Sequence, residues 1–353
     1  VLDSLQYRKV KTADRLEELI LSQSHAEGVK YLFIDEIQNV AGFEEVVNAF
    51  REDGNYSIFI TGSNSYLLSG ELVTKLTGRY IEFEMFPLTF DEYLDMKAFY
   101  GKPVNANLIA ELNSYLQEGG FPKTMQYDDF ADKRTYVKSV IDEIFEKDIR
   151  RRLKIRNVEA FNNVRSFIIN NFGATMSIQS LQAALEKNGI AVKRSTLTRY
   201  IEALVQSKIL YRCDRFDMKS KKSLGGEKKY YLADTSFYFS TNTDNRINYV
   251  PALENMVYLY ARSFDYSVSV GRIGKLECDF ILRDNSLNYA YVQVAYTIGE
   301  SKATEDREYA PLEMIKDNYP KFVLTTDYLL QKRSGIRHLN LLEFMRTQKG
   351  FSD

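Results

Sequence analysis

Residues 31 to 38 read YLFIDEIQ, an uncharged apolar run that ends abruptly in the two carboxylates of Asp35 and Glu36. A run this short, rich in aromatic and branched side chains, is typical of a strand buried on both faces at the centre of a parallel sheet. Its carboxylates then lie at the carboxyl end of the strand, where open α/β sheets bind their ligands. The sequence therefore predicts a ligand site that begins with Asp35 and Glu36.

An apolar strand that delivers Asp-Glu to this edge has the Walker B pattern. In that pattern the aspartate holds Mg²⁺, directly or through water, and the glutamate polarises the water that attacks a γ-phosphate. A buried strand followed by an acidic helix cap would have the same residues. The next apolar stretch, residues 57 to 64 (SIFITGSN), favours the Walker B interpretation. It predicts a second parallel strand, and Ser63 and Asn64 at its end would lie beside the acid pair.

Three strings, IDEIQNV, ITGSNSYLLSGELVTKLTGRY and FPLTFDEYL, resemble the archaeal and bacterial AAA-like ATPases that carry a C-terminal DUF4143 domain. The resemblance extends over nearly the whole chain, and the ITGSN…LSGEL…GRY string is its most specific part. It implies ATP and Mg²⁺ as ligands, with Asp35 on the metal and Glu36 on the attacking water. Ser63 or Asn64 would sense the γ-phosphate. Arg79 would stabilise charge, within its own subunit or on a neighbour in a homo-oligomer.

One feature of that family is missing from the sequence, because no G-x-x-x-x-G-K-[ST] motif occurs among the 353 residues. The chain begins at about the point where the family has passed its phosphate-binding loop, so it resembles a member truncated at its N-terminus. Without the backbone N–H cradle and the lysine of that loop, the phosphates lose their main anchor. We therefore expect ATPase activity from the intact family architecture and not from this polypeptide.

Length and composition predict a cytoplasmic protein of two or three domains, since 353 residues exceed what a single core usually organises. No apolar run approaches membrane-spanning length and no signal peptide precedes Val1, so we expect no membrane partner. The isolated Cys213 and Cys278 argue against a disulfide framework, and His25 and His338 are too few for a zinc site. With a net charge of −1, nucleic-acid binding would need a local basic patch.

The expected fold class is α/β, in three domains. Residues 1–88 form a truncated P-loop NTPase-like parallel sheet, residues 89–240 a helical lid with a winged helix, and residues 241–353 a DUF4143-type, PD-(D/E)XK nuclease-like α/β domain. In the first domain we expect a helix from Thr12 to Gln23, a helix from Ser65 to Tyr80 and a third strand from Glu82 to Leu88. The lid is expected to contain helices over residues 91–100, 106–118 and 132–154.

Residues 161 to 240 have the pattern of a winged helix, with three helices followed by two short strands around a lysine-rich loop. In this arrangement the outer residues of the third helix face the major groove of double-stranded DNA. Here these residues are Lys193, Arg194, Thr196, Thr198 and Arg199, and the loop lysines that would contact phosphates are Lys219, Lys221 and Lys222. Many winged helices instead dock proteins, and lysine-rich loops are usually only solvated, so both interpretations stay open.

In residues 241 to 353 three polar residues fall in the order of a PD-(D/E)XK nuclease-like site, with Glu254 on a helix, Asp279 on a strand and Gln293 on the next strand. In such sites carboxylates hold Mg²⁺ and a nearby lysine orients water. Ala295 stands where that lysine should be, and glutamine is a weaker ligand than glutamate. Because metal sites need their full set of ligands, we expect a degenerate, inactive nuclease-like domain.

Two functional classes follow from these patterns. The first is an AAA-like, ATP-hydrolysing protein with a DNA-binding winged helix. The alternative is a non-catalytic DNA- or protein-binding module that contains a degenerate nuclease-like domain. The missing phosphate-binding loop favours the first class for the intact family and the second for this polypeptide. On the helix that follows residue 300, Glu305, Arg307 and Glu308 are expected to form only a solvated face.

Overall fold

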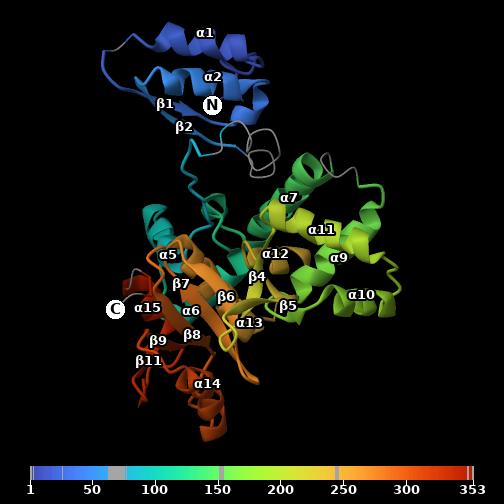
Figure 1. The fold of residues 1–353 in the computed structure, drawn as a ribbon, viewed down its shortest axis with the longest axis vertical. Coiled ribbons are helices and arrows are strands. Elements are labelled where there is room, and N and C mark those ends of the chain that lie inside the picture. The colour runs from blue at the N-terminus through green and yellow to red at the C-terminus, as the bar shows by residue number, and fades with distance from the viewer. Residues whose placement is uncertain are drawn as a thin grey trace. The chain divides into compact units, whose positions relative to one another are not determined.

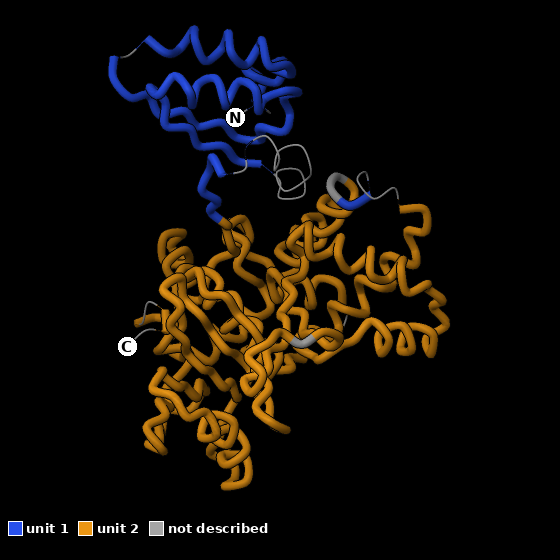
Figure 2. Tube along the Cα trace, viewed as in Figure 1, with its two compact units in different colours: residues 1–83, 147–152 blue, residues 84–146, 153–353 orange. Residues whose placement is uncertain are grey.

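The computed structural model describes residues 2, 4–25, 27–62, 76, 78–150, 155–242, 246–347 and 350–351. The side chains of residues 147, 148 and 224 are outside this description. The chain forms two compact units, unit 1 from residues 1–83 and 147–152 and unit 2 from residues 84–146 and 153–353 (Figure 2). None of the described helices is both long enough and apolar enough to cross a membrane.

Among its described residues from 2 to 83, unit 1 contains two α-helices, a short 3₁₀ helix and a two-stranded sheet (Figure 1). Its elements are α1 (Ala13–Gln23), β1 (Lys30–Ile34), the short 3₁₀ helix η1 (Ile37–Asn39), α2 (Phe43–Glu52) and β2 (Tyr56–Ile60). The strands are parallel and pair along their whole length, with Ile34 opposite Ile60. The sequence therefore predicted this strand pair and the first helix correctly.

Only one face of this small sheet is covered by described residues. Leu32 and Ile34 pack into a core with α1 and α2, whereas Tyr31 and Phe33 are 69% and 71% exposed. Phe33 stacks on Phe59 of β2 with ring centroids 4.9 Å apart. The prediction of a strand buried on both faces is therefore wrong for the described residues, because the side chains of both helices join the core on the Leu32 and Ile34 face.

No strand forms over residues 82–88, where a third strand was predicted. The chain there lies outside the described helices and strands, and the alternating side chains of Ile81, Phe83 and Met85 are 81%, 77% and 87% exposed. A segment with alternating side chains forms a strand only if an adjacent strand hydrogen-bonds to its backbone N–H and C=O groups. The helix predicted from Ser65 to Tyr80 falls almost entirely outside the described residues.

Unit 2 begins with a group of helices. They are α5 (Phe90–Phe99), α6 (Leu108–Glu118), the 3₁₀ helix η2 (Pro122–Gln126), α7 (Phe130–Ile144), α9 (Val158–Asn170), α10 (Ile178–Lys187), α11 (Arg194–Gln206) and α12 (Ser236–Thr241). The π-helix η3 (Phe145–Arg150) follows α7 directly, and its residues from 147 onward belong to unit 1. Short polar side chains cap several N-termini, as at Thr89, Asn107, Asp129 and Ser177. The predicted lid helices are present, although the third leaves the α-helical form after Ile144.

The turn at Gly119 and Gly120, after α6, is hydrogen-bonded to the buried carboxylate of Asp234. The backbone N–H of Gly120 donates to Asp234 Oδ2 at 2.7 Å, and that of Ser236 donates to Asp234 Oδ1 at 2.8 Å. A Cβ atom on Gly119 would lie 2.0 Å from Asp234 Oδ1, and one on Gly120 would lie 2.4 Å from the carbonyl oxygen of Leu88. Both glycines are therefore required by close packing, and Gly119 also has a positive φ of 79°.

A single nine-stranded mixed sheet forms the rest of unit 2, with strand order β10-β11-β9-β8-β7-β6-β4-β5-β3. Its strands are β3 (Thr175–Met176), β4 (Leu210–Asp217), β5 (Lys222–Leu232), β6 (Ser267–Ile273), β7 (Leu276–Arg283), β8 (Tyr289–Val294), β9 (Lys321–Thr325), β10 (Lys332–Arg333) and β11 (Ile336–Asn340). Helices that pack on it include α11 on β4, α13 (Tyr249–Ser263) on β5 to β8, α14 (Lys302–Met314) on β7 to β9, and α15 (Leu341–Thr347) on β11.

The sheet runs across the predicted boundary between residues 240 and 241. β4 pairs with β6 in parallel, with Asp217 opposite Arg272, so the hairpin β4–β5 and the C-terminal strands share one ladder. The turn between β4 and β5 is also shorter than the predicted loop, because β5 already begins at Lys222. The three-domain division stays a prediction about which parts fold by themselves.

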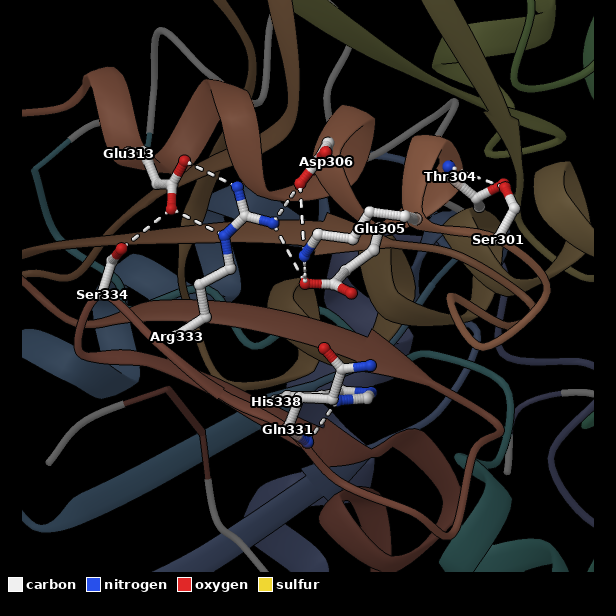
Figure 3. Close-up of polar contacts among 10 residues, drawn as sticks. Ser301, Thr304, Glu305, Asp306, Glu313, Gln331, Arg333, Ser334 and His338 are labelled. Atoms are coloured by element: carbon white, nitrogen blue, oxygen red, sulfur yellow. Dashed lines mark hydrogen bonds and ion pairs between the residues drawn. The ribbon is translucent and has the colours of Figure 1, made fainter.

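Arg333 of the hairpin β10–β11 forms ion pairs with α14 (Figure 3). Its guanidinium lies between carboxylates of that helix, with Nε 2.8 Å from Glu313 Oε1 and Nη1 3.0 Å from Glu305 Oε1. The side chain of Glu305 is only 12% exposed as a result, and that of Glu308 is 7% exposed. The expectation of a purely solvated face is therefore wrong for both glutamates, and it holds only for Arg307, which is 73% exposed.

Candidate functional sites

The first candidate site is the carboxyl edge of the parallel strands in unit 1. Asp35 and Glu36 follow β1, and Thr61 follows β2. The Thr61 hydroxyl donates to Asp35 Oδ1, and the Glu36 backbone N–H donates to Thr61 Oγ1 at 3.3 Å. The register of the two strands causes this meeting, because Ile34 and Ile60 are paired immediately before these residues. The sequence thus placed the acid pair correctly, but it missed Thr61 as the partner.

Glu36 is held in an uncommon backbone conformation. Its φ is 56°, in the left-handed region, and its carboxylate accepts a hydrogen bond from Gln38 Nε2. Left-handed conformations of side-chain-bearing residues cost free energy, and they are concentrated at sites where function fixes a side-chain direction. At this position the conformation sets the direction of the second carboxylate of the Asp-Glu pair.

The other residues predicted for this site are not brought to it among the described residues. Ser63 and Asn64 lie outside the described part of the chain. Arg79 is exposed, and its Nη1 lies 3.5 Å from Asn48 Oδ1 of α2. None of the hydrogen bonds or ion pairs of the described residues joins Arg79 to Asp35. The proposed roles of these three residues stay predictions.

The acidic edge fits a magnesium ion. Mg²⁺ in phosphate-transfer sites is usually held by one or two carboxylates, with waters and phosphate oxygens completing an octahedron. Asp35 is half-buried, and among the described residues its Oδ2 atom has no hydrogen-bond partner, while Oδ1 is fixed by Thr61. One carboxylate oxygen of a fixed side chain is therefore available to a metal.

The second candidate site is the outer side of α11. Leu197, Tyr200, Ile201 and Leu204 face the core, and the polar residues alternate with them on the outside. The predicted DNA-facing side chains follow this pattern: Lys193, Arg194, Thr198 and Arg199 are exposed and Thr196 is partly exposed. The Thr198 hydroxyl donates to the carbonyl oxygen of Arg194 at 3.0 Å, so it is turned back onto the helix.

A cluster of cations gathers where two hairpins end side by side. The backbone N–H of Met218 donates to the carbonyl oxygen of Arg272 at 3.0 Å, so the β4–β5 and β6–β7 turns are neighbours (Figure 1). We call the exposed cations there the basic tip; they are Lys219, Lys221, Lys222, Arg272 and Lys275. Among the described residues none of them forms an ion pair. The nearby Glu277 and Asp214 are already paired, with Arg215 at 3.0 Å and Lys228 at 2.7 Å.

The third candidate site is a group of polar side chains in unit 2, all buried except the half-buried Glu277. We call it the buried centre, and it consists of Lys229, Glu254, Glu277, Asp279, Gln293 and Glu308. The three residues predicted for a nuclease-like site are all within it, since Asp279 and Gln293 are directly hydrogen-bonded and Glu254 lies close enough to interact with Asp279 electrostatically. Lys229 and Glu308 were not predicted, although they contact the predicted residues directly.

The contacts of the buried centre are well defined. Lys229 Nζ lies 3.0 Å from Glu254 Oε2 and 3.2 Å from Glu277 Oε1. The Asp279 backbone N–H donates to Gln293 Oε1 at 3.2 Å, and Gln293 Nε2 donates to Glu308 Oε2 at 2.9 Å. Asp279 Oδ2 accepts from the backbone N–H that follows Gln293 at 2.8 Å. The amide of Gln293 therefore has both ends occupied by protein groups.

Burial and charge act together on the ionisable groups of this centre. Burial, followed by the charge of Glu254, raises the pKa of Asp279 well above its ordinary value. Burial also raises the pKa of Glu254, although Lys229 opposes that change. For Lys229, burial lowers the pKa, but the carboxylates of Glu254, Asp279 and Glu277 outweigh it and raise the pKa above its ordinary value. The ammonium is therefore held in its charged form.

The buried centre does not fit the metal that a nuclease-like site implies. A divalent ion needs several unoccupied oxygen ligands around one point. Here Lys229 occupies the point on which Glu254 and Glu277 converge, and the oxygen of Gln293 is already used. In the described part of the chain, no three His, Cys, Asp or Glu side chains are grouped so that they could hold a metal ion.

Comparison with known protein families identifies two matching segments of the chain. Residues 1–94 match the family described as "AAA domain", and residues 109–245 match a domain of unknown function, DUF8612. An uncharacterized protein of Haemophilus influenzae is 32% identical over 346 residues, which are 97% of this chain and 84% of that protein. The chain belongs to this AAA-domain, ATPase-like family.

Two archaeal relatives of this AAA-domain protein come from Methanocaldococcus jannaschii. The uncharacterized protein MJ1544 is 31% identical over 314 residues, 86% of this chain and 69% of its own, and MJ1637 is 22% identical over 336 residues, 85% and 69%. Among solved structures, the Walker-type ATPase PABY2304 of Pyrococcus abyssi is similar, with a TM-score of 0.41, 17% identity and 67% of each chain covered. The AAA match is as predicted, the middle of the chain matches DUF8612, and the DUF4143 assignment stays a prediction.

Proposed function

We propose that unit 1 of this AAA-domain protein contributes the magnesium- and water-positioning edge of an ATP site. Asp35 would hold Mg²⁺, and Glu36 would orient the water that attacks the γ-phosphate. Ser63 or Asn64 would sense the γ-phosphate, and Arg79 would neutralise charge in its own subunit or in a neighbouring one. Mg²⁺ would supply the counter-charge for the phosphates when it is bound.

The contact that carries this proposal is the hydrogen bond from Thr61 to Asp35. It fixes the aspartate at the carboxyl edge of two parallel strands and leaves its second oxygen available. The match of residues 1–94 to the AAA domain supports ATP as the ligand. The proposal concerns this acidic edge alone, because the 353 residues contain no G-x-x-x-x-G-K-[ST] sequence whose backbone would cradle the phosphates.

A titration with fluorescent ATP, in Mg²⁺ and in EDTA, tests the proposal. We expect weak, saturable binding that requires Mg²⁺ and is lost in Asp35→Ala. Asp14→Ala is the matched control, because Asp14 is an exposed aspartate on α1 of the same unit. Binding that is unchanged in Asp35→Ala, or no saturable binding at millimolar nucleotide, would contradict the proposal. Phosphate release measured on the same samples reports any turnover.

A second proposal is that unit 2 binds double-stranded DNA through a winged helix. Two features support it: the exposed outer side of α11 with Lys193, Arg194 and Arg199, and the basic tip. At the basic tip Glu277 and Asp214 are paired internally with Arg215 and Lys228, so of the three acids Asp217, opposite Arg272, is left to offset the five exposed cations, which keep an excess of positive charge for phosphates. Arg272 and Lys275 extend the surface beyond the three lysines that the sequence indicated.

The salt dependence of duplex binding tests this second proposal. Each phosphate contact that is lost should reduce the slope of log K against log[salt] by about 0.9. The triple variant Lys219→Ala, Lys221→Ala, Lys222→Ala should therefore lower the slope by roughly 2.7. The control replaces three exposed cations of unit 1, Arg8, Lys9 and Lys11, with alanine. Equal slopes for the wild type and the tip variant would remove the basic tip from the interface.

A further inference from the structure

A buried lysine lies at the position where a nuclease-like site would hold its metal. Lys229 comes from β5, and its side chain is only 7% exposed. Lysine is almost never buried to this degree unless it is paired. Its ammonium reaches Glu254 of α13 at 3.0 Å and Glu277 of β7 at 3.2 Å, so two carboxylates from separate elements converge on one nitrogen atom.

The surrounding groups hold this ammonium in place. Tyr231, two residues along β5, donates its hydroxyl to the same Glu254 oxygen at 2.9 Å. Arg215 approaches the other carboxylate, with Nη2 at 3.0 Å from Glu277 Oε2. The two carboxylates that bind Lys229 are therefore each fixed by a second donor. Such fixed carboxylates would suit a metal ion, but here a protein cation is bound between them.

For electrostatic reasons, the ammonium of Lys229 and a divalent metal ion cannot both bind between these two carboxylates. Both are cations, both would bind the same two carboxylate oxygens, and their mutual repulsion is strong at such short range and poor hydration. The sequence shows alanine at position 295, where the nuclease-like pattern has its lysine. Lys229 does not restore that pattern, because it comes from a strand on the far side of β7, β6 and β4 in the sheet order and is bound to the carboxylates themselves.

We propose that Lys229 is the resident cation of the buried centre, which consequently needs no divalent metal ion. The centre then joins the β4–β5 hairpin to α13 and β7 as an internal ion-pair network. Asp279 fits this assignment. Its Oδ2 atom accepts from a backbone N–H, and in the part of the chain that the structure describes no cation forms an ion pair with it, so burial and the charge of Glu254 leave its pKa raised. The proposal also predicts a latent metal site, because removing the ammonium would leave Glu254 without its cation and would free the Glu277 oxygen that Arg215 does not bind.

Manganese binding, followed by the electron paramagnetic resonance signal of free Mn²⁺, tests this inference. Mn²⁺ is the appropriate probe because it prefers the same oxygen ligands as Mg²⁺. All proteins carry Asp35→Ala, so that the acidic edge of unit 1 does not contribute, and no nucleotide is added. We expect no stoichiometric Mn²⁺ binding in this background. Adding Lys229→Ala should create one site, with an affinity gain on the order of tenfold or more over the background.

Further variants make the outcome decisive. Glu254→Gln added to Lys229→Ala should abolish the new site, whereas Glu227→Gln, which changes an exposed glutamate beside Arg215, should not. One tightly bound Mn²⁺ in the background, unchanged by Lys229→Ala, would overturn the proposal. So would a folded Lys229→Ala protein, checked by circular dichroism, that gains no site. If Lys229→Ala does not fold by itself, Mn²⁺ should restore its folding, followed by circular dichroism, because an ion that binds only the folded form stabilises it. Failure of Mn²⁺ to do so would also overturn the proposal.

Discussion

Asp234, the carboxylate beneath the Gly-Gly turn, should make the stability of unit 2 depend on pH in an unusual direction. Burial raises its pKa from 3.8 to about 6, although hydrogen bonds from Ser236 and from the Gly120 backbone act in the opposite direction. Asp234 is only 2% exposed, so solvent screens this effect little. The shift corresponds to about 3 kcal/mol of free energy between the two protonation states.

The sign follows from proton counting. Between about pH 4 and pH 6 the folded protein retains a proton on Asp234 that the unfolded chain has already lost. Stability contributed by this residue therefore falls as the pH rises through that window, and it is constant above about pH 7. The contribution is opposite to that of an ordinary ion-paired aspartate, whose folded-state pKa is lowered and whose stabilisation disappears in acid.

Urea unfolding followed by far-ultraviolet circular dichroism measures the effect, since the chain has no tryptophan. The quantity of interest is the free energy of unfolding of the wild type minus that of Asp234→Asn, at several pH values. We expect this difference to fall by about 2.4 kcal/mol between pH 4 and pH 7, slightly less than the full shift because the unfolded chain is still partly protonated at pH 4. Asp132→Asn, at an exposed aspartate of α7, should show no such trend. A difference that is flat, or that rises with pH, would mean that the hydrogen bonds outweigh burial and would refute the reasoning.

Three further substitutions test other parts of the fold, each by the same unfolding assay. Gly120→Ala should destabilise unit 2 by about 1–3 kcal/mol, because the new Cβ would lie 2.4 Å from a backbone carbonyl oxygen, and an unchanged stability would contradict that contact. Glu111→Ala should cost about 3 kcal/mol by leaving the ammonium of Lys97 without the carboxylate that it contacts at 2.7 Å, and Lys97→Met added to it should recover part of the loss. Phe33→Ala should cost only about 1 kcal/mol, the worth of its stacking on Phe59, since Phe33 is 71% exposed. Phe43→Ala at a buried position should cost about 3–5 kcal/mol, and similar losses at both sites would show that the face of Phe33 is covered.

The local sequence pattern was sufficient where neighbours in the chain determine the structure. The run that ends in Asp35 and the run before Ser63 each form a strand, and their parallel pairing follows from the helix between them. Helix starts were also predictable to within a few residues, as at Thr89 and Ser177, where a short polar side chain bonds the first turn. The order of Glu254, Asp279 and Gln293 along the chain indicated their grouping, because each falls on a predicted helix or strand of the same domain.

Contacts between distant segments were not predictable from the same patterns. Alternation at residues 82–88 resembled a strand, but no neighbour pairs with it among the described residues. Lys229 was not expected in the buried centre, because it belongs to a predicted wing strand and no local pattern connects it with α13. Glu308 was expected to be solvated, since it lies in a charged helix, yet it bonds Gln293. The partners of Lys229 and Glu308 lie on other helices and strands, so only the tertiary structure identifies them.

The parallel pairing of β4 with β6 limits how this protein can be divided during evolution. A recombination joint near residue 240 would separate β3, β4 and β5 from the remainder of their sheet and would expose the backbone edge of β6. It would also leave Glu254 in one fragment and Lys229 in the other, each a buried charge without its counter-ion. A cut near residue 240 should therefore give two fragments that do not fold separately, whatever function the two parts have.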